Sequence, residues 1–210
     1  MIDVIQIGAN IGNTPQDIIW PVVRDNGWNC IFVEPHPEAF EQLVKNYSDL
    51  VGSHFENIAI CAHDGTVKFH YGKDSQIASL NRDHSINAFG GVRNNNEIEV
   101  PCSTLSSLIK KYDMKGKPFE LLQIDAEGAD GSILICTDFT EILPKYIRFE
   151  HIYLNRHLTL SRPDAIRKGL LEILEHLCRF GYRLVKDQYN SGQESEDNID
   201  TMMERKNGLS

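Results

Sequence analysis

Apolar residues in the N-terminal part of the chain form two short runs, each followed by a periodic segment. Residues 2–7 are rich in β-branched side chains and stop at Gly8, and residues 28–33 form a similar run that ends at Glu34. Both patterns are typical of buried strands. The sequence at 14–17, a hydroxyl residue followed by proline and later an acid, predicts the start of a helix. Pro21 lies inside this helix and predicts a kink or a division there.

The alternation of strands and helices continues to the C-terminus. A helix from Pro37 places its apolar residues at i, i+3, i+4 and i+7, namely Phe40, Leu43, Val44 and Tyr47. Further strands are predicted at 53–60, 66–71, 98–102, 119–125 and 144–151, further helices at 104–112, around 133–135 and from Pro163 to Gly181, and a closing hairpin at 182–186 and 199–205. This order predicts one α/β domain over residues 1–210, with a Rossmann-like, doubly wound, mostly parallel sheet and a C-terminal antiparallel hairpin.

One polar segment interrupts this order. Residues 72–96 contain few apolar positions and several glycine and asparagine residues. Long loops in compact domains usually have a function, so we expect this segment to be a lid or a substrate-binding insertion over the active site.

Composition excludes several classes of partner. The net charge of −9 argues against nucleic acid as a partner, because a phosphate backbone would be repelled by most of this surface. We see neither a secretory leader nor a membrane-spanning run, so we expect a cytoplasmic protein without membrane insertion. Nothing in the sequence indicates an oligomeric state.

The cysteines and most of the histidines do not predict a metal site. The five cysteines are scattered and never form a C-x-x-C pair, so we expect buried or half-buried free thiols in a reducing compartment. The histidines outside position 151 show no metal-ligand spacing. No metal is expected.

A glycine turn and an acid predict a site for an adenosine-containing ligand. Gly8-Ala9-Asn10-Ile11-Gly12 directly follows the first strand, where ligands bind in open α/β sheets. Glu34, which ends the second strand, can accept hydrogen bonds from both ribose hydroxyls. A dinucleotide fingerprint would place glycine at Asn10 and Asn13, so a nicotinamide-dependent oxidoreductase remains only an alternative.

Several blocks together resemble a known family. The segments I-G-A-N-I-G, V-E-P-H-P, N-I-A-I, T-L-S-S-L and L-L-Q-I-D-A-E-G-A-D occur in the order of the FkbM family of S-adenosylmethionine-dependent methyltransferases, and they span residues 2 to 151. The resemblance implies a class I methyltransferase fold, S-adenosylmethionine as cofactor and O-methylation of a hydroxyl on a small molecule, sugar or glycan. A non-catalytic member that only binds the cofactor is a further alternative.

The resemblance also implies roles for individual residues. The cofactor would contact Gly8, Ala9, Asn10 and Gly12 with its methionine and ribose parts, Glu34 and Pro35 with its ribose, and Asn57, Ile58 and Ala59 with its adenine. Asp125, Glu127 and Gly128 would face the reacting methyl group, and Asp125 would also belong to the cofactor-binding set. Three positions depart from the family pattern: Gln6 replaces an acid, Gln123 a lysine and Asp130 a glutamate.

Methylation of a hydroxyl is assisted by a general base. Asp125, Glu127, Glu150 and His151 follow two neighbouring strands and should converge at the carboxyl edge of the sheet. We favour His151 as the base, because its ordinary pKa is close to neutral pH. The same four side chains could hold Mg²⁺, but their spacing does not require it.

Overall fold

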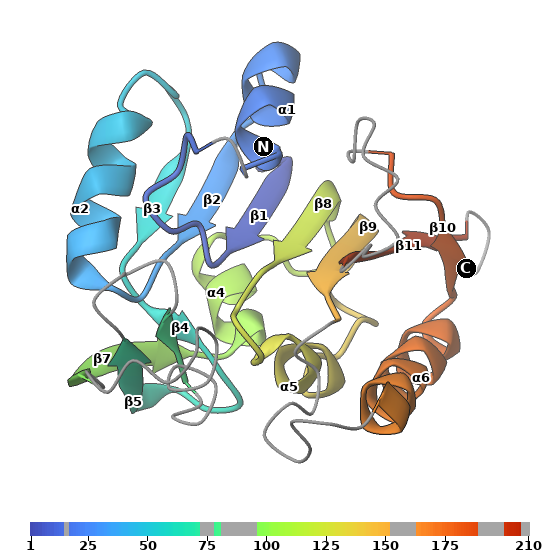
Figure 1. Ribbon diagram of the computed structural model, residues 1–210. Coiled ribbons are helices and arrows are strands. Elements are labelled where there is room, and N and C mark those ends of the chain that lie inside the picture. The colour runs from blue at the N-terminus through green and yellow to red at the C-terminus, as the bar shows by residue number, and fades with distance from the viewer. Residues whose placement is uncertain (15–16, 72–77, 81–95, 152–162, 189–199, 207–210) are drawn as a thin grey trace.

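A seven-stranded sheet forms the centre of the computed structural model (Figure 1), which describes residues 1–14, 17–71, 78–80, 96–151, 163–188 and 200–206. Its strands are β1 (Val4–Ile7), β2 (Cys30–Val33), β3 (His54–Glu56), β8 (Pro118–Ile124), β9 (Leu143–Glu150), β10 (Tyr182–Val185) and β11 (Asp200–Arg205). They lie in the order β10-β11-β9-β8-β1-β2-β3. Only β11 runs antiparallel to its neighbours, β9 and β10. The predicted parallel sheet and C-terminal hairpin are confirmed.

Helices cover both faces of this sheet because its strands are apolar on both sides. Helices α1 (Ile19–Asn26) and α2 (Pro37–Asn46) pack on the face that contains Val4 and Phe32. Helices α4 (Leu105–Lys111), α5 (Asp130–Ile135) and α6 (Pro163–Arg179) pack on the opposite face with Ile5 and Ile7. This two-sided cover is the doubly wound arrangement expected from the alternating sequence pattern. Every helix among the described residues is too short or too polar to cross a lipid bilayer.

A second, smaller sheet lies beyond the carboxyl ends of the parallel strands (Figure 1). Its order is β4-β7-β5-β6, with β4 at Ala59–Ile60, β5 at Gly65–Tyr71, β6 at Ala78–Ser79 and β7 at Asn96–Ser103. The prediction of one strand over 53–60 is therefore wrong. Glu56 still pairs with Val33 of β2, whereas Ala59 pairs with Cys102 of β7, so the chain passes from one sheet to the other at residues 57–58.

The first helix begins later than predicted. The side chain of Asp17, rather than that of Thr14, accepts hydrogen bonds from the first helical N–H groups, at 3.0 Å from Ile19 and 3.2 Å from Trp20. Pro21 consequently falls in the first turn, where its missing N–H has no intrahelical partner to lose. The predicted kink at Pro21 is wrong for this reason. The predicted cap at Thr14-Pro15 lies partly outside the described residues.

The predictions for residues 72–96 and for the cysteines have different outcomes. Of the predicted lid, residues 72–77 and 81–95 lie outside the described part of the chain.

All five cysteines are free, as expected, but Cys136 and Cys178 are exposed. The scattered spacing of the cysteines along the sequence did not predict that two of them lie close together. The pairing of β4 with β7 brings Cys61 close to Cys102.

Candidate active site

The glycine turn after β1 is packed tightly between neighbouring parts of the protein. Gly8 has a positive φ of 79°, and a Cβ there would lie 1.8 Å from the backbone oxygen of Asp125. Gly12 has φ of 61°, and its Cβ would lie 2.4 Å from the ring of Tyr47. No residue with a side chain can occupy either position without displacing its neighbours. The two glycines therefore fix the turn against β8 and α2, and this fixes the path of the backbone that faces the site.

Glu34 connects this turn to the end of β2. Its Oε2 accepts a hydrogen bond from the backbone N–H of Asn10 at 2.8 Å, and its Oε1 accepts one from the N–H of His36 at 2.7 Å. The side chain is buried, and this desolvation raises the pKa of Glu34 to about 7 although the two N–H donors lower it. The side-chain amide of Asn57 donates to the carbonyl oxygens of Glu34 and Pro35, at 2.8 and 3.2 Å. Asn57 lies between β3 and β4, and its side chain thus holds the backbone of Glu34 and Pro35 in place.

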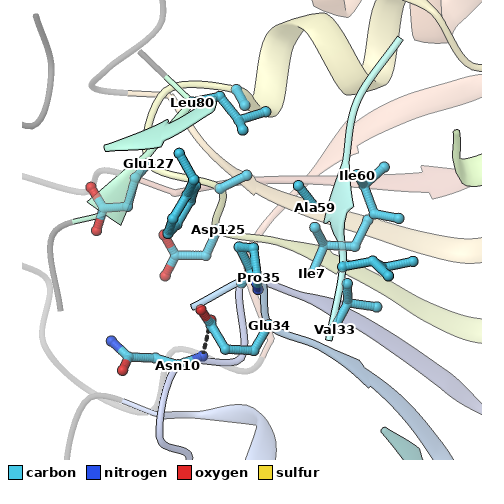
Figure 2. Close-up of a pocket in the computed structure, with 15 residues that line it drawn as sticks. Ile7, Asn10, Val33, Glu34, Pro35, Ala59, Ile60, Leu80, Asp125 and Glu127 are labelled. Carbon is cyan, nitrogen blue, oxygen red and sulfur yellow. Dashed lines mark hydrogen bonds between the residues drawn. The ribbon is translucent and has the colours of Figure 1, made fainter. Parts of the chain in front are cut away.

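The carboxylate of Glu34 faces a pocket with largely apolar walls, which we call the apolar pocket (Figure 2). Its lining comes from the ends of β1, β2 and β8 and from the small sheet: Ile7, Gly8, Asn10, Val33, Glu34, Pro35, Ile58, Ala59, Ile60, Phe69, Leu80, Asp125, Ala126, Glu127 and Ala129. Most of the residues assigned to the cofactor by the family resemblance therefore surround one cavity. Asn57 does not line it and acts on its wall only through the backbone of residues 34 and 35.

A second, polar pocket lies on the other side of the glycine turn. It is lined by Gln6, Gly8, Ala9, Asn10, Gly12, Thr14, Asp17, Ile18, Ile19, Gln123, Asp125, Glu127 and Arg148. Four residues line both cavities, namely Gly8, Asn10, Asp125 and Glu127. Ala9 and Gly12, the two remaining residues of the predicted glycine set, lie in the polar pocket alone. The two pockets therefore share a wall formed by the glycine turn and the segment that follows β8.

Acidic side chains gather where β8 and β9 end. Desolvation raises the pKa of Asp125 well above its ordinary value, and the charges of Asp130 and Glu127 raise it further; the carboxyl still reaches solvent through the open pockets. Burial raises the pKa of Asp130 to about 6. Burial and the neighbouring acids raise the pKa of Glu150 to about 10. Glu150 is consequently a neutral carboxylic acid at neutral pH.

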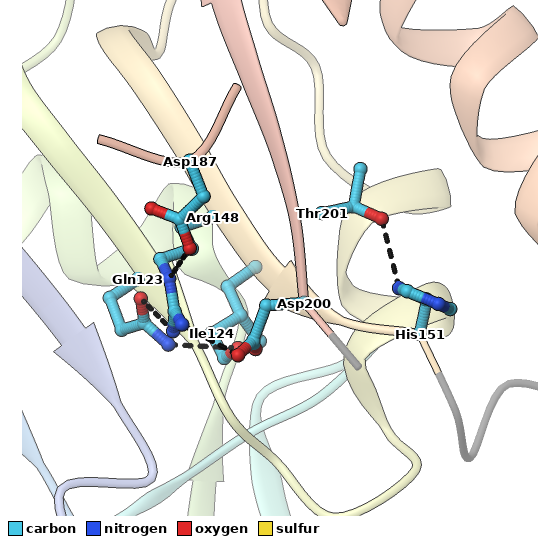
Figure 3. A network of polar contacts seen from close by, with 7 residues as sticks. All are labelled: Gln123, Ile124, Arg148, His151, Asp187, Asp200 and Thr201. Atoms are coloured by element: carbon cyan, nitrogen blue, oxygen red, sulfur yellow. Dashed lines mark hydrogen bonds and ion pairs between the residues drawn. The ribbon is translucent and has the colours of Figure 1, made fainter. Parts of the chain in front are cut away.

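The four candidate bases occupy different positions around the site. Asp125 and Glu127 line both pockets, whereas neither pocket lining includes Glu150 or His151. His151 lies beside β11, with its Nδ1 3.0 Å from the hydroxyl of Thr201 (Figure 3). Desolvation lowers the pKa of His151, so its imidazole is neutral near pH 7. All four lie at the carboxyl edge of the sheet as predicted, but only the two carboxylates after β8 reach the cavities.

One buried arginine, which the sequence reasoning missed, balances part of this negative charge. Arg148 pairs with Asp187 at 2.8 Å and with Asp200 at 2.5 Å, and its Nη1 donates to Oε1 of Gln123 at 3.2 Å (Figure 3). Arg148 of β9 thus places a cation beside Gln123, at the position where the family resemblance implies a lysine. A signal for this existed in the sequence, since Gln6, Gln123 and Arg148 are polar positions near the ends of three apolar strands. They pair directly across the sheet.

Comparison with solved structures finds relatives of low sequence identity. The fibrillarin pre-rRNA processing protein of Methanococcus jannaschii is 15% identical with a TM-score of 0.48, over 98% of this chain and 67% of that one. Fibrillarin of Aeropyrum pernix, solved with natively bound S-adenosyl-L-methionine, is 10% identical with a TM-score of 0.45, over 96% of this chain and 65% of that one. A putative methyltransferase from Thermoplasma acidophilum is 9% identical with a TM-score of 0.39, over 99% of this chain and 69% of that one. This chain thus spans about two thirds of the length of each.

Comparison with protein families gives a direct assignment. No curated protein sequence matches the chain. The model of the methyltransferase FkbM domain, in contrast, matches residues 6–184, which include the glycine turn, Glu34 and all of the acids that follow β8 and β9. The chain belongs to the FkbM methyltransferase family.

Proposed function

We propose that this S-adenosylmethionine-dependent methyltransferase transfers its methyl group to a hydroxyl oxygen of a small molecule, sugar or glycan. The observation that carries the proposal is the position of Asp125 and Glu127, which line both the apolar and the polar pocket. A donor that spans the two pockets would expose its reacting centre to these carboxylates. An acceptor hydroxyl bound there would find a proton acceptor within the same cavity.

The apolar pocket suits the adenosine half of the donor. Each oxygen of Glu34 accepts one backbone N–H, and a carboxylate oxygen has two lone pairs. Each oxygen therefore retains acceptor capacity for one ribose hydroxyl. Ile58, Phe69 and Leu80 supply apolar wall for a flat, uncharged base.

The polar pocket suits the methionine half. Gln6 lines it, and the buried Oε1 of Gln6 has no hydrogen-bond partner among the residues that the structure describes. A buried acceptor without a donor costs free energy, and the ammonium group of a methionine would relieve that cost. Gln6 therefore fits this role although related proteins use an acid at this position. The surrounding carboxylates also favour a ligand that carries a positive sulfonium and a positive ammonium.

Methyl transfer to a hydroxyl requires that donor and acceptor are aligned and that a base accepts the hydroxyl proton. S-adenosylmethionine supplies a methyl group on a positively charged sulfur: the carbon–sulfur bond breaks as a carbon–oxygen bond forms, and the hydroxyl proton leaves. Holding both reactants in line contributes on the order of 7–11 kcal/mol to such reactions. We assign the proton to the carboxylate of Asp125, because Asp125 lines both pockets and its raised pKa makes the ionised form a stronger base. His151, which the sequence reasoning favoured, is the alternative base.

The arrangement of the first helix argues against a dinucleotide ligand. Dinucleotide sites place a pyrophosphate at the N-terminus of the helix that follows the glycine turn. Here α1 does not begin until Ile19, and the carboxylate of Asp17 already accepts its first N–H groups. An anionic pyrophosphate would have to displace this carboxylate. The nicotinamide-dependent alternative is therefore disfavoured.

Binding and turnover test the proposal separately. Calorimetry with S-adenosylhomocysteine should show one site, whereas NAD should not bind. Transfer of labelled methyl groups should then be assayed on a panel of sugar, glycan and small-molecule hydroxyls, with an amine and thiol panel beside it. Binding without transfer to any hydroxyl would refute the O-methyltransferase proposal and favour a non-catalytic member of the family. Failure of a folded protein to bind would refute the cofactor assignment itself.

A further inference from the structure

The turn between β4 and β5 crosses the end of β7 and gathers three metal-ligand side chains there. In the small sheet, β7 lies between β4 and β5, and Cys102 of β7 is the partner of both Ala59 and Gly65. Cys61 follows β4 directly, and His63 lies in the connecting turn. The strand order alone therefore places Cys61, His63 and Cys102 side by side. None of these three residues is part of the lining of the apolar or the polar pocket.

The spacing of the three ligand atoms matches a tetrahedral metal site. The two sulfur atoms and one imidazole nitrogen all lie within 4.8 Å of one another. The Sγ of Cys102 is 3.6 Å from Nδ1 of His63. Tetrahedral zinc with ordinary bond lengths holds a sulfur and a nitrogen about 3.6 Å apart, and two sulfurs about 3.8 Å apart. Small side-chain rotations would bring all three atoms to one ion.

The turn is held in place by hydrogen bonds that do not involve the side chains of Cys61, His63 or Cys102. The carboxylate of Asp64 accepts hydrogen bonds from the N–H of Thr104 at 2.8 Å and from the hydroxyl of Ser107 at 2.7 Å, at the start of α4. The N–H of Cys61 donates to the carbonyl oxygen of Ser103 at 3.0 Å. These bonds fix the backbone on both sides of His63. Such outer contacts pre-organise metal sites and contribute to their affinity.

Both thiols point at one carbonyl oxygen. Cys61 and Cys102 donate to the backbone oxygen of His63 at 3.0 and 3.4 Å. Thiols are weak hydrogen-bond donors, so two thiols on one acceptor contribute little stability. Two thiolates, in contrast, bind one cation strongly. Coordination would release the two thiol protons to solvent and replace these bonds.

We propose that Cys61, His63 and Cys102 form a Zn²⁺ site that fastens the β4–β5 turn to β7. Thiolate and imidazole ligands select zinc over Mg²⁺ or Ca²⁺, which prefer oxygen. Cys102 is buried, Cys61 is half-buried and His63 is exposed, so the ion sits at the edge of the small sheet with its fourth position toward solvent. Ala59 and Ile60, which directly precede Cys61, line the apolar pocket, so the metal stabilises one of its walls.

Zinc titration of the reduced, metal-free protein tests this proposal independently of methyl transfer. In competition with a chromophoric chelator, wild-type protein should bind one equivalent of Zn²⁺, and Co²⁺ should give thiolate charge-transfer and tetrahedral absorption bands. Bound zinc should also raise the melting temperature, because it binds the folded state. His63→Asn changes an exposed side chain, and Cys61→Ser a half-buried one, so both variants should fold.

The variants decide between the proposal and its alternatives. Each of His63→Asn and Cys61→Ser should lower zinc affinity by at least about tenfold, because each removes one of three ligands. Cys136→Ser removes an exposed cysteine outside the cluster and should leave the affinity unchanged. Equal zinc affinity in all four proteins would overturn the proposal, as would the absence of stoichiometric binding by the folded wild type.

Discussion

Replacing Glu34 by glutamine tests the central contact of the site. The carboxylate accepts N–H groups from Asn10 and His36 at 2.8 and 2.7 Å and would accept both ribose hydroxyls of the cofactor. Glutamine keeps one oxygen acceptor and loses the charge and the second acceptor. A hydrogen bond to a charged group contributes about 1.5–3 kcal/mol. Loss of one such bond to the ribose predicts that S-adenosylhomocysteine binds about 10- to 150-fold more weakly.

The pH dependence of cofactor binding provides a second test of the contact between Glu34 and the ribose. Because burial raises the pKa of Glu34 to about 7, the acid is partly protonated at neutral pH in the free protein. The ionised form accepts the ribose hydroxyls, so affinity should be highest above pH 7 and should fall as pH decreases below it, by at most about tenfold per unit. In Glu34→Gln this part of the pH dependence should disappear between pH 6 and 8.

Calorimetry across this pH range measures both effects, and circular dichroism confirms that each variant is folded. Glu41→Gln is a suitable control, because Glu41 is an exposed acid of α2. If Glu34→Gln binds as tightly as the wild type, with the same pH dependence, the ribose contact assigned to Glu34 does not exist.

Three further predictions follow from the packing and charge of the site. Gly8→Ala should cost about 2 kcal/mol or more beyond Gly116→Ala in urea unfolding, because both glycines have positive φ but only Gly8 faces a backbone oxygen at 1.8 Å. Asp125→Asn should lower kcat by about 10²–10⁴-fold and should weaken cofactor binding by a much smaller factor, and a larger kcat loss in His151→Gln would reassign the base. Arg148→Met should lower the free energy of unfolding at pH 7 by about 3–5 kcal/mol, because the buried Asp187 and the half-buried Asp200 lose their cation; an unchanged urea midpoint would contradict this.

The order of the fold could be predicted from the sequence because each central strand is a short apolar run closed by a glycine or an acid. Gly8 and Glu34 directly follow the last residues of β1 and β2, as the sequence pattern predicted. The second sheet could not be predicted, because its first strand has only the two residues Ala59–Ile60 and continues the pattern of β3 without a break. Periodicity carries no information on which neighbour a strand will pair with.

The part of the candidate site around the glycine turn was more predictable than the part at the ends of β9 and β11. Residues around Gly8 and Glu34 are close in sequence to the strands that position them, so their meeting follows from the parallel sheet. Arg148 was missed because its partners Asp187 and Asp200 come from after α6, and only the return of β11 beside β9 brings them near. The grouping of Cys61 with Cys102 depends in the same way on a pairing between distant segments.

The long antiparallel pair β5–β7 has a consequence for exchanging the segment that connects its two strands. Its register runs from Gly65 opposite Cys102 to Tyr71 opposite Asn96, so the two ends of the segment between Tyr71 and Asn96 are already joined by the ladder. Exchanging that segment for one of another length costs little, since the free energy of closing a loop grows only slowly with its length. Segments from related enzymes could therefore be transplanted between Leu80 and Asn96, which leaves Leu80 in the wall of the apolar pocket and keeps the pairing of β6 with β5.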